Sequence, residues 1–174
     1  MSSSTGGTIS VTSALDKEIS QKILGYIFMS PNFGINNKFA NMISWPLSEY
    51  WLKLILGKNI KHNPRNDLNK KFWTMSYPTN ALIPMGKLIK AVNKNDYSTV
   101  DKPALFYFSM EDKVVDPNKI KKFISNWGGK ITTKIVRLSS KDDKFSHVLA
   151  GDIISPYQTE HAKLIMVNWI KNLN

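Results

Sequence analysis

Two uninterrupted apolar runs, each about as long as one β-strand, constrain the fold of this chain more than any other feature. The first is Ile23–Met29, and the second lies within Lys102–Ser109, with Pro103 near its start. A strand with one face in water alternates apolar and polar residues, whereas a strand covered on both faces, as in a parallel sheet, is apolar throughout. We therefore predict two buried strands of a mostly parallel sheet.

Helical patterns lie before, between and after the predicted strands. Apolar residues four apart predict an amphipathic helix from about Thr8 to Lys22 before the first strand. A second helix follows Asp116 and is closed by Gly128-Gly129, and Lys130–Ser139 alternates weakly as a third strand. A last helix is marked by Ala162, Met166, Trp169 and Leu173. Parallel strands joined by crossover helices make the predicted fold class α/β.

Residues 36–99 differ from the segments around them. Scattered aromatic residues and short helical patterns replace the strand-like runs, with the clearest helix over Leu47–Ile55 and another over Ala81–Val92. The segment is interpreted either as a helical cap inserted over a site or as an ordinary pair of covering helices. The predicted organisation is a core made of residues 1–35 and 100–174, with residues 36–99 as a helical cap or lid.

Composition narrows the classes of function. The length of 174 residues suits one domain. The absence of cysteine excludes disulfides, a zinc ribbon and a cysteine nucleophile. The common nucleotide and zinc motifs are also missing, and the adjacent carboxylates of Asp142 and Asp143 do not by themselves make a cation site. We therefore expect neither a cofactor nor a metal.

The formal net charge of +11 allows a nucleic-acid partner, but the lysines are spread along the chain. The densest cluster, Lys119–Lys122, falls on the predicted solvent face of a helix, so we expect a solvated surface and no nucleic acid. No apolar run approaches the ~20 residues of a membrane span. No signal peptide is visible, and the cytoplasm is the favoured compartment, while the oligomeric state stays open.

The first residues, Ser2-Ser3-Ser4-Thr5-Gly6, have two interpretations. A Ser/Thr/Gly-rich start is typical of a flexible tail. The same order also suits a tight strand-to-helix turn of the G-x-S-x-G type, called a nucleophile elbow, in which the serine occupies a strained corner above the sheet. Ser2 replaces the first glycine of that pattern.

Three loops at predicted strand ends hold Ser4, Asp112 and His147, in that order along the chain. Ligands of open α/β sheets bind beyond the carboxyl ends of the strands. A serine hydroxyl becomes a nucleophile when a histidine takes its proton and a carboxylate steadies the imidazolium. Asp116 is an alternative acid, although it better suits the N-cap of the next helix. His62 and His161 are alternatives to His147.

These patterns resemble the C-terminal half of an α/β-hydrolase of the carboxylesterase or lysophospholipase kind. The resemblance rests on Ser4–Thr8, on Pro103–Pro117 with its D-x-V-V-D-P loop, and on Ser146-His147. It implies a Ser-His-Asp triad that cleaves carboxylic esters, such as small esters or lipids, through an acyl-enzyme. Ser4 would be the nucleophile, Asp112 the acid and His147 the base. The backbone N–H of Thr5 would line the oxyanion hole.

One departure from that family affects the expected activity. Its members place several strands before the elbow, and a loop after an early strand supplies the second oxyanion donor. We therefore expect the chain to be the C-terminal portion of a longer ester hydrolase, with little turnover by itself. The alternative is a non-catalytic remnant or acyl-binding module of the same fold.

Overall fold

Four parallel strands form the central sheet in the computed structural model, which describes residues 1–37, 43, 45 and 47–173. The strands are β1 (Ser2–Ser3), β2 (Tyr26–Met29), β5 (Ala104–Phe108) and β6 (Ile131–Ile135), and they lie in the order β1-β2-β5-β6. Every neighbouring pair is parallel, with Phe28 beside Phe106 in the register. The α/β class predicted from the two apolar runs is confirmed.

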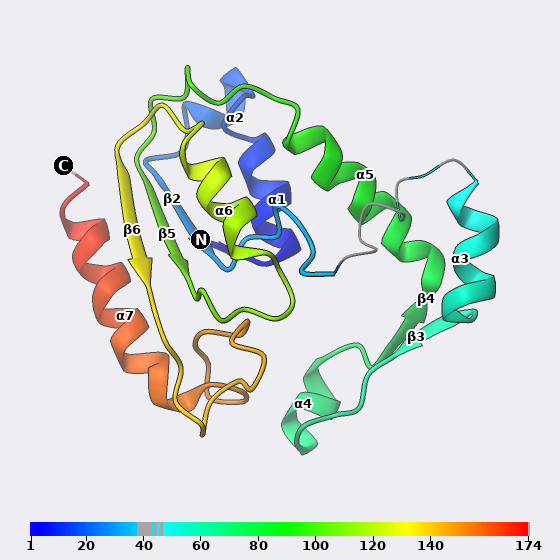
Figure 1. Ribbon diagram of the computed structural model, residues 1–174. Helices are drawn as coiled ribbons and strands as arrows, with labels where there is room; N and C mark the ends of the chain where they lie inside the picture. Colours follow the sequence, from blue (N-terminus) through cyan, green and yellow to red (C-terminus); the bar gives the residue numbers. More distant parts are fainter. Residues whose placement is uncertain (38–42, 44, 46, 174) are drawn as a thin grey trace.

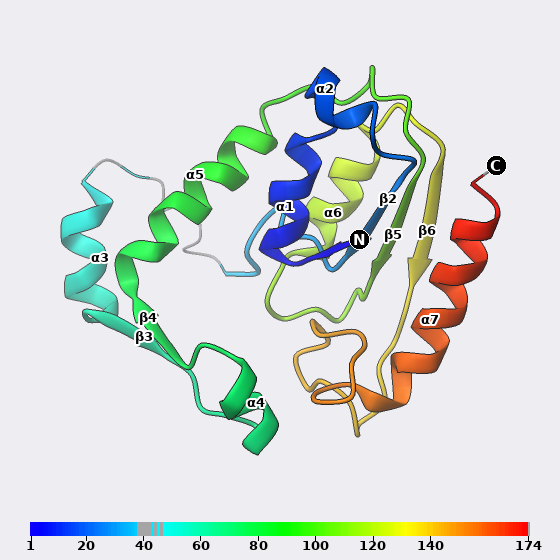
Figure 2. The same ribbon diagram turned by 180° about the vertical axis from the view of Figure 1, so that it is seen from behind.

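Helices cover both faces of this sheet (Figures 1 and 2). The helices outside residues 36–99 are α1 (Thr5–Thr12), α2 (Lys17–Ser20), α6 (Pro117–Ile124) and α7 (Pro156–Lys171). One core cluster joins Val11 of α1 and Ile120 of α6 to Phe28 and Phe106. A second cluster, on the opposite face, packs Met166 and other residues of α7 against the sheet. Alternate residues of the buried strands thus point into two separate cores.

Aromatic rings fill the larger core. Phe28 stacks on Phe106 with ring centroids 5.1 Å apart, and Trp127 meets both rings edge-on. Offset and edge-to-face pairs stabilise a core beyond the area that they bury, by about 0.5–1.5 kcal/mol each. This packing fixes β2 against β5, and the carboxyl ends of both strands carry loops of the site described below.

The predicted helix from Thr8 to Lys22 is wrong, because two shorter helices occupy the region. α1 begins earlier, at Thr5, and α2 starts anew after Asp16, whose side chain accepts a hydrogen bond from Ile19 N at 3.0 Å. Leu15 and Ile19, two of the apolar residues four apart on which that helix was predicted, are 39% and 47% exposed. The local cap at Asp16 outweighs the weak apolar periodicity.

The predicted C-cap at Gly128-Gly129 is also wrong, because α6 already ends at Ile124. Both glycines instead lie where other backbone comes close. A Cβ atom would stand 1.9 Å from the Ser98 carbonyl oxygen at Gly128, and 2.1 Å from the Lys102 oxygen at Gly129. Only glycine allows the chain to enter β6 this close to the segment that leads into β5.

The segment of residues 36–99 contains helices and a short hairpin. Its elements are α3 (Ser48–Leu56), β3 (Asn59–Lys61), α4 (Asp67–Phe72), β4 (Ser76–Pro78), the 3₁₀ turn η2 (Thr79–Ala81) and α5 (Leu82–Val92). The antiparallel pair β3–β4 was not predicted, since three residues are too short for a period-2 signal. Part of the predicted cap, residues 38–42, 44 and 46, lies outside the described residues.

Much of the apolar face predicted over Leu47–Ile55 lies in solvent. Tyr50, Leu54 and Ile55 are 66%, 86% and 65% exposed, whereas Leu52 is buried. In both ribbon views α5 extends from beside the sheet to α3, and α4 lies near the loop that precedes α7 (Figures 1 and 2). None of the helices in the described part of the chain is long and apolar enough to cross a membrane.

Candidate active site

Ser4 lies at the tight junction between β1 and α1. Its backbone has φ 50° and ψ −128°, a strained combination for a residue with a side chain. Hydrogen bonds to β2 and to the loop after it hold the residue there: Ser4 N donates to Met29 O at 3.1 Å, and Asn32 N donates to Ser4 O at 3.0 Å. A serine before a helix usually caps it, but this hydroxyl bonds none of the described N–H groups of α1. The side chain is therefore free to face another partner.

The close approach at this junction falls at Gly7. A Cβ atom on Gly7 would lie 2.8 Å from the Cβ of Pro31, whereas no described atom lies within 4 Å of the corresponding position at Gly6. Gly6 is the glycine that fits the G-x-S-x-G pattern in the sequence. The steric need for glycine is thus one residue further along, where α1 meets the loop after β2.

His147 lies between Ser4 and Asp112. His147 Nε2 is 3.0 Å from Ser4 Oγ, and His147 Nδ1 is 2.8 Å from Asp112 Oδ2. An ionised carboxylate only accepts hydrogen bonds, so this contact assigns the ring proton to Nδ1 and leaves Nε2 as the acceptor of the serine proton. Ser4 and His147 are 143 residues apart in the sequence, yet the three side chains form one continuous line of hydrogen bonds.

Asp112 is held for this contact by the backbone around it. Its side chain is fully buried, and Oδ1 accepts from Val114 N at 2.8 Å and Val115 N at 2.9 Å. The other oxygen, Oδ2, faces His147. Two backbone donors on one oxygen fix the carboxylate plane, so the histidine ring meets a carboxylate that cannot turn easily.

The alternative acid and bases take no part in this line of hydrogen bonds. Asp116 caps α6, with its side chain accepting from Asn118 N at 2.9 Å, as its position before Pro117 predicts. His62 lies 3.4 Å from Tyr77 OH on the β3–β4 hairpin, and His161 is an exposed residue of α7.

Thr5 begins α1 directly after Ser4. The first N–H groups of a helix have no acceptor within the helix, so this N–H is available to a ligand. The Thr5 hydroxyl accepts from Asn32 Nδ2 at 3.3 Å, which ties the start of α1 to the loop after β2.

The loop that carries His147 is organised by two carboxylates that had no predicted role. Asp142 accepts from Ser139 and from Tyr157 N, and thereby fastens both ends of the loop. Asp143 accepts from three backbone N–H groups of the loop and from the Arg65 guanidinium. An adjacent acidic pair in a lysine-rich stretch carries no signal that distinguishes this buried use from a solvated turn.

Burial alone raises the pKa of the Asp143 carboxyl. Hydrogen bonds from Val148 N, Phe145 N, Arg65 and His147 N outweigh burial and bring that pKa below its ordinary value. The carboxylate is therefore charged at neutral pH, and the N–H donors and the guanidinium compensate its charge.

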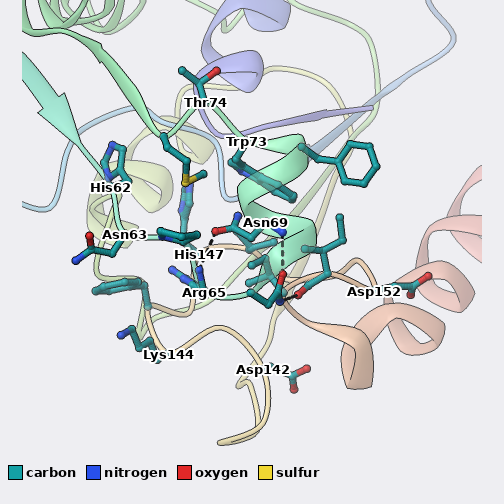
Figure 3. A pocket seen from close by; sticks show the side chains of 18 of the residues that line it. His62, Asn63, Arg65, Asn69, Trp73, Thr74, Asp142, Lys144, His147 and Asp152 are labelled. Carbon is teal, nitrogen blue, oxygen red and sulfur yellow. Dashed lines mark hydrogen bonds between the residues drawn. The ribbon is translucent and has the colours of Figure 1, made fainter.

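A cavity of about 1590 Å³ opens beside His147. One wall comes from the loop before α7. The other comes from α4 and the ends of the β3–β4 hairpin and includes Arg65, Asn69 and Trp73 (Figure 3). Further aromatic lining comes from Phe72, Tyr77 and Phe145. The cavity mixes apolar and polar surface, so it can hold an amphipathic small molecule next to the histidine.

No protein-family model matches the chain, and no curated protein matches its sequence. Solved structures do match. A soluble variant of the monoglyceride lipase from Saccharomyces cerevisiae, crystallised with a substrate analogue, aligns at TM-score 0.67 and 15% identity, over 99% of this chain and 60% of that one. The monoacylglycerol lipase of Paleococcus ferrophilus gives 0.64 and 16%, over 98% and 66%.

Mouse alpha/beta hydrolase domain-containing protein 10 also matches, at TM-score 0.58 and 13% identity, over 99% of this chain and 61% of that protein. The chain thus spans less than two thirds of the length of these structures. At such low identities the similarity is one of architecture, and it agrees with the parallel sheet and crossover helices described above. The chain has the α/β-hydrolase fold over the part of that fold that it spans.

Proposed function

We propose that this chain belongs to a serine hydrolase that cleaves carboxylic esters, with Ser4 as nucleophile, His147 as base and Asp112 as acid. The observation that carries the proposal is the unbroken line from Ser4 Oγ to His147 and on to Asp112, at 3.0 Å and 2.8 Å. The strained backbone at Ser4 adds support, because it turns the hydroxyl away from helix capping and toward the histidine.

In the proposed reaction, His147 Nε2 takes the Ser4 proton while Oγ attacks the ester carbonyl. The Thr5 N–H stabilises the oxyanion, and Asp112 stabilises the imidazolium. His147 then returns the proton to the departing alcohol, leaving an acyl group on Ser4. Water, activated by the same histidine, releases the acid and restores the serine.

The proposed substrate is a small ester or a lipid. The cavity beside His147 supports this choice, because aromatic side chains line it close to the proposed base. The first two similar structures are described as monoglyceride and monoacylglycerol lipases. Residues 36–99 supply one wall of the cavity, and we propose that they act as a cap that shapes the bound acyl or alcohol part.

Covalent labelling tests the proposal more directly than turnover. We assign one oxyanion donor, Thr5, and losing one donor typically lowers the rate ~10²–10³-fold. A fluorophosphonate probe needs only an activated serine, so we expect it to label the chain at Ser4, as located by peptide mass spectrometry.

Neighbouring serines provide matched controls. Ser4→Ala should abolish labelling, Ser3→Ala should retain it, and His147→Ala should reduce it to the level of an unactivated hydroxyl. Equal labelling of wild type and His147→Ala would contradict the proposal. Saturable fatty-acid binding by an unlabelled chain would instead favour a non-catalytic acyl-binding module.

A further inference from the structure

Asp143 is a fully buried carboxylate that the proposed reaction does not use. Oδ2 accepts from His147 N at 3.1 Å and Val148 N at 2.8 Å, and Oδ1 accepts from Phe145 N at 2.9 Å. The backbone turns sharply between these donors: Ser146 N donates to Asp143 O at 2.8 Å, and Ser146 has φ 52°. The carboxylate therefore lies at the centre of the turn that presents His147.

The cation that faces Asp143 comes from a distant part of the chain. Arg65, between β3 and α4, places Nη1 against Asp143 Oδ1, and its guanidinium carbon lies 4.9 Å from the centre of the Phe145 ring. The Arg65 side chain is 29% exposed, so the pair lies at the edge of the cavity rather than deep in the core. A buried carboxylate that loses its cation is strongly destabilised.

A second contact joins the same two segments. Asn66 Nδ2 donates to Ile153 O at 2.8 Å, and Asn66 also caps α4 through Asn69 N at 2.7 Å. The start of α4 thus meets the His147 loop at two points, one charged and one neutral. Arg65 and His147 both line the cavity (Figure 3).

We propose that Asp143 is a positioning residue for His147, and that Arg65 fixes that position from the segment between β2 and β5. This inference rests on the proposed role of His147 as base. When the start of α4 packs against the loop before α7, Arg65 pairs with the Asp143 carboxylate, and this carboxylate accepts the backbone N–H of His147. When the start of α4 is displaced, the turn loses its cation and the imidazole loses its alignment with Ser4.

The test compares Arg65→Ala, Arg65→Lys and Asp143→Asn with wild type by two measurements. Amide hydrogen exchange at Phe145, His147 and Val148 reports the turn, and the rate of fluorophosphonate labelling reports the alignment of the base. We expect Arg65→Ala to speed exchange at these amides about tenfold, the size expected for one hydrogen bond to a charged group. Labelling of Ser4 should slow by a similar factor.

Conservative replacement and a matched control separate positioning from general loss of structure. Arg65→Lys keeps a cation at Asp143 and should recover part of both effects. Lys163→Ala removes an exposed ion pair on α7 and should change neither measurement. If Asp143→Asn fails to fold, the Arg65 variants still decide, because Arg65 is partly exposed.

Two outcomes would overturn the inference. In the first, the three amides of Arg65→Ala exchange at the wild-type rate. In the second, they exchange faster, but Ser4 is labelled at the wild-type rate. Failure of the proposed function has a different signature. An unlabelled wild-type Ser4 would refute the hydrolase, and the exchange experiment would then show only whether Arg65 orders the turn.

Discussion

Ser4 holds a backbone conformation that its neighbours impose. Strand β2 and the loop after it impose this conformation: Met29 O and Asn32 N bond the Ser4 backbone, and Pro31 of the loop lies against Gly7. The sequence pattern predicted a hydroxyl at the corner and matched Gly6 to its last glycine, whereas the close packing falls on Gly7. The need for glycine at position 7 could not be read from the sequence, because its partner Pro31 is 24 residues away.

The glycine pair allows a direct test. Gly7→Ala forces a Cβ against the backbone and ring of Pro31, so we expect a loss of about 1–3 kcal/mol in unfolding free energy and slower labelling of Ser4. Gly6→Ala enters open space on a helix and should stabilise the chain by up to about 1 kcal/mol. Urea denaturation measures both variants. An equal loss in the two would contradict the steric assignment.

The elements differ in how well the sequence predicts them. The strands β2 and β5 were predicted because burial on both faces makes their residues uniformly apolar. The hairpin β3–β4 was missed, and α1 and α2 were merged, because short elements are decided by caps and tertiary contacts. In the candidate site, the order Ser…Asp…His could be seen in the sequence. The contact of Arg65 with Asp143 could not, because the two residues are 78 positions apart and no local pattern connects them.

The loop before α7 should respond to acid through Asp143. Its pKa is lowered in the folded chain, so its stabilising contribution is complete above the ordinary aspartate pKa of ~3.9 and is lost as the pH falls through the lower native value. We expect the melting temperature of wild type to fall more steeply below about pH 4 than that of Asp143→Asn. Thermal melts followed by circular dichroism from neutral to acid pH measure this; parallel curves for the two proteins would exclude the effect.

At the scale of the whole molecule, the four-stranded sheet separates two cores among the described residues, and the smaller core depends on α7. Met166 is buried in that core, whereas Ile170, one turn further along the same helix, is 51% exposed. Met166→Ala should cost about 2–5 kcal/mol through lost burial and a cavity. Ile170→Ala should stay within about 0.5 kcal/mol of wild type. Denaturant titration distinguishes the two; similar losses would mean that α7 packs differently.

The long segment between β2 and β5 begins and ends at neighbouring places in the fold. Asn93, just after α5, donates through Nδ2 to Phe33 O at 2.8 Å. A segment whose ends are joined by the core can change in length and sequence at little cost in chain entropy. Under the proposed function, exchange of this segment would alter the choice of substrate while Ser4, His147 and Asp112 stay in place. Any replacement must still bring a cation to Asp143.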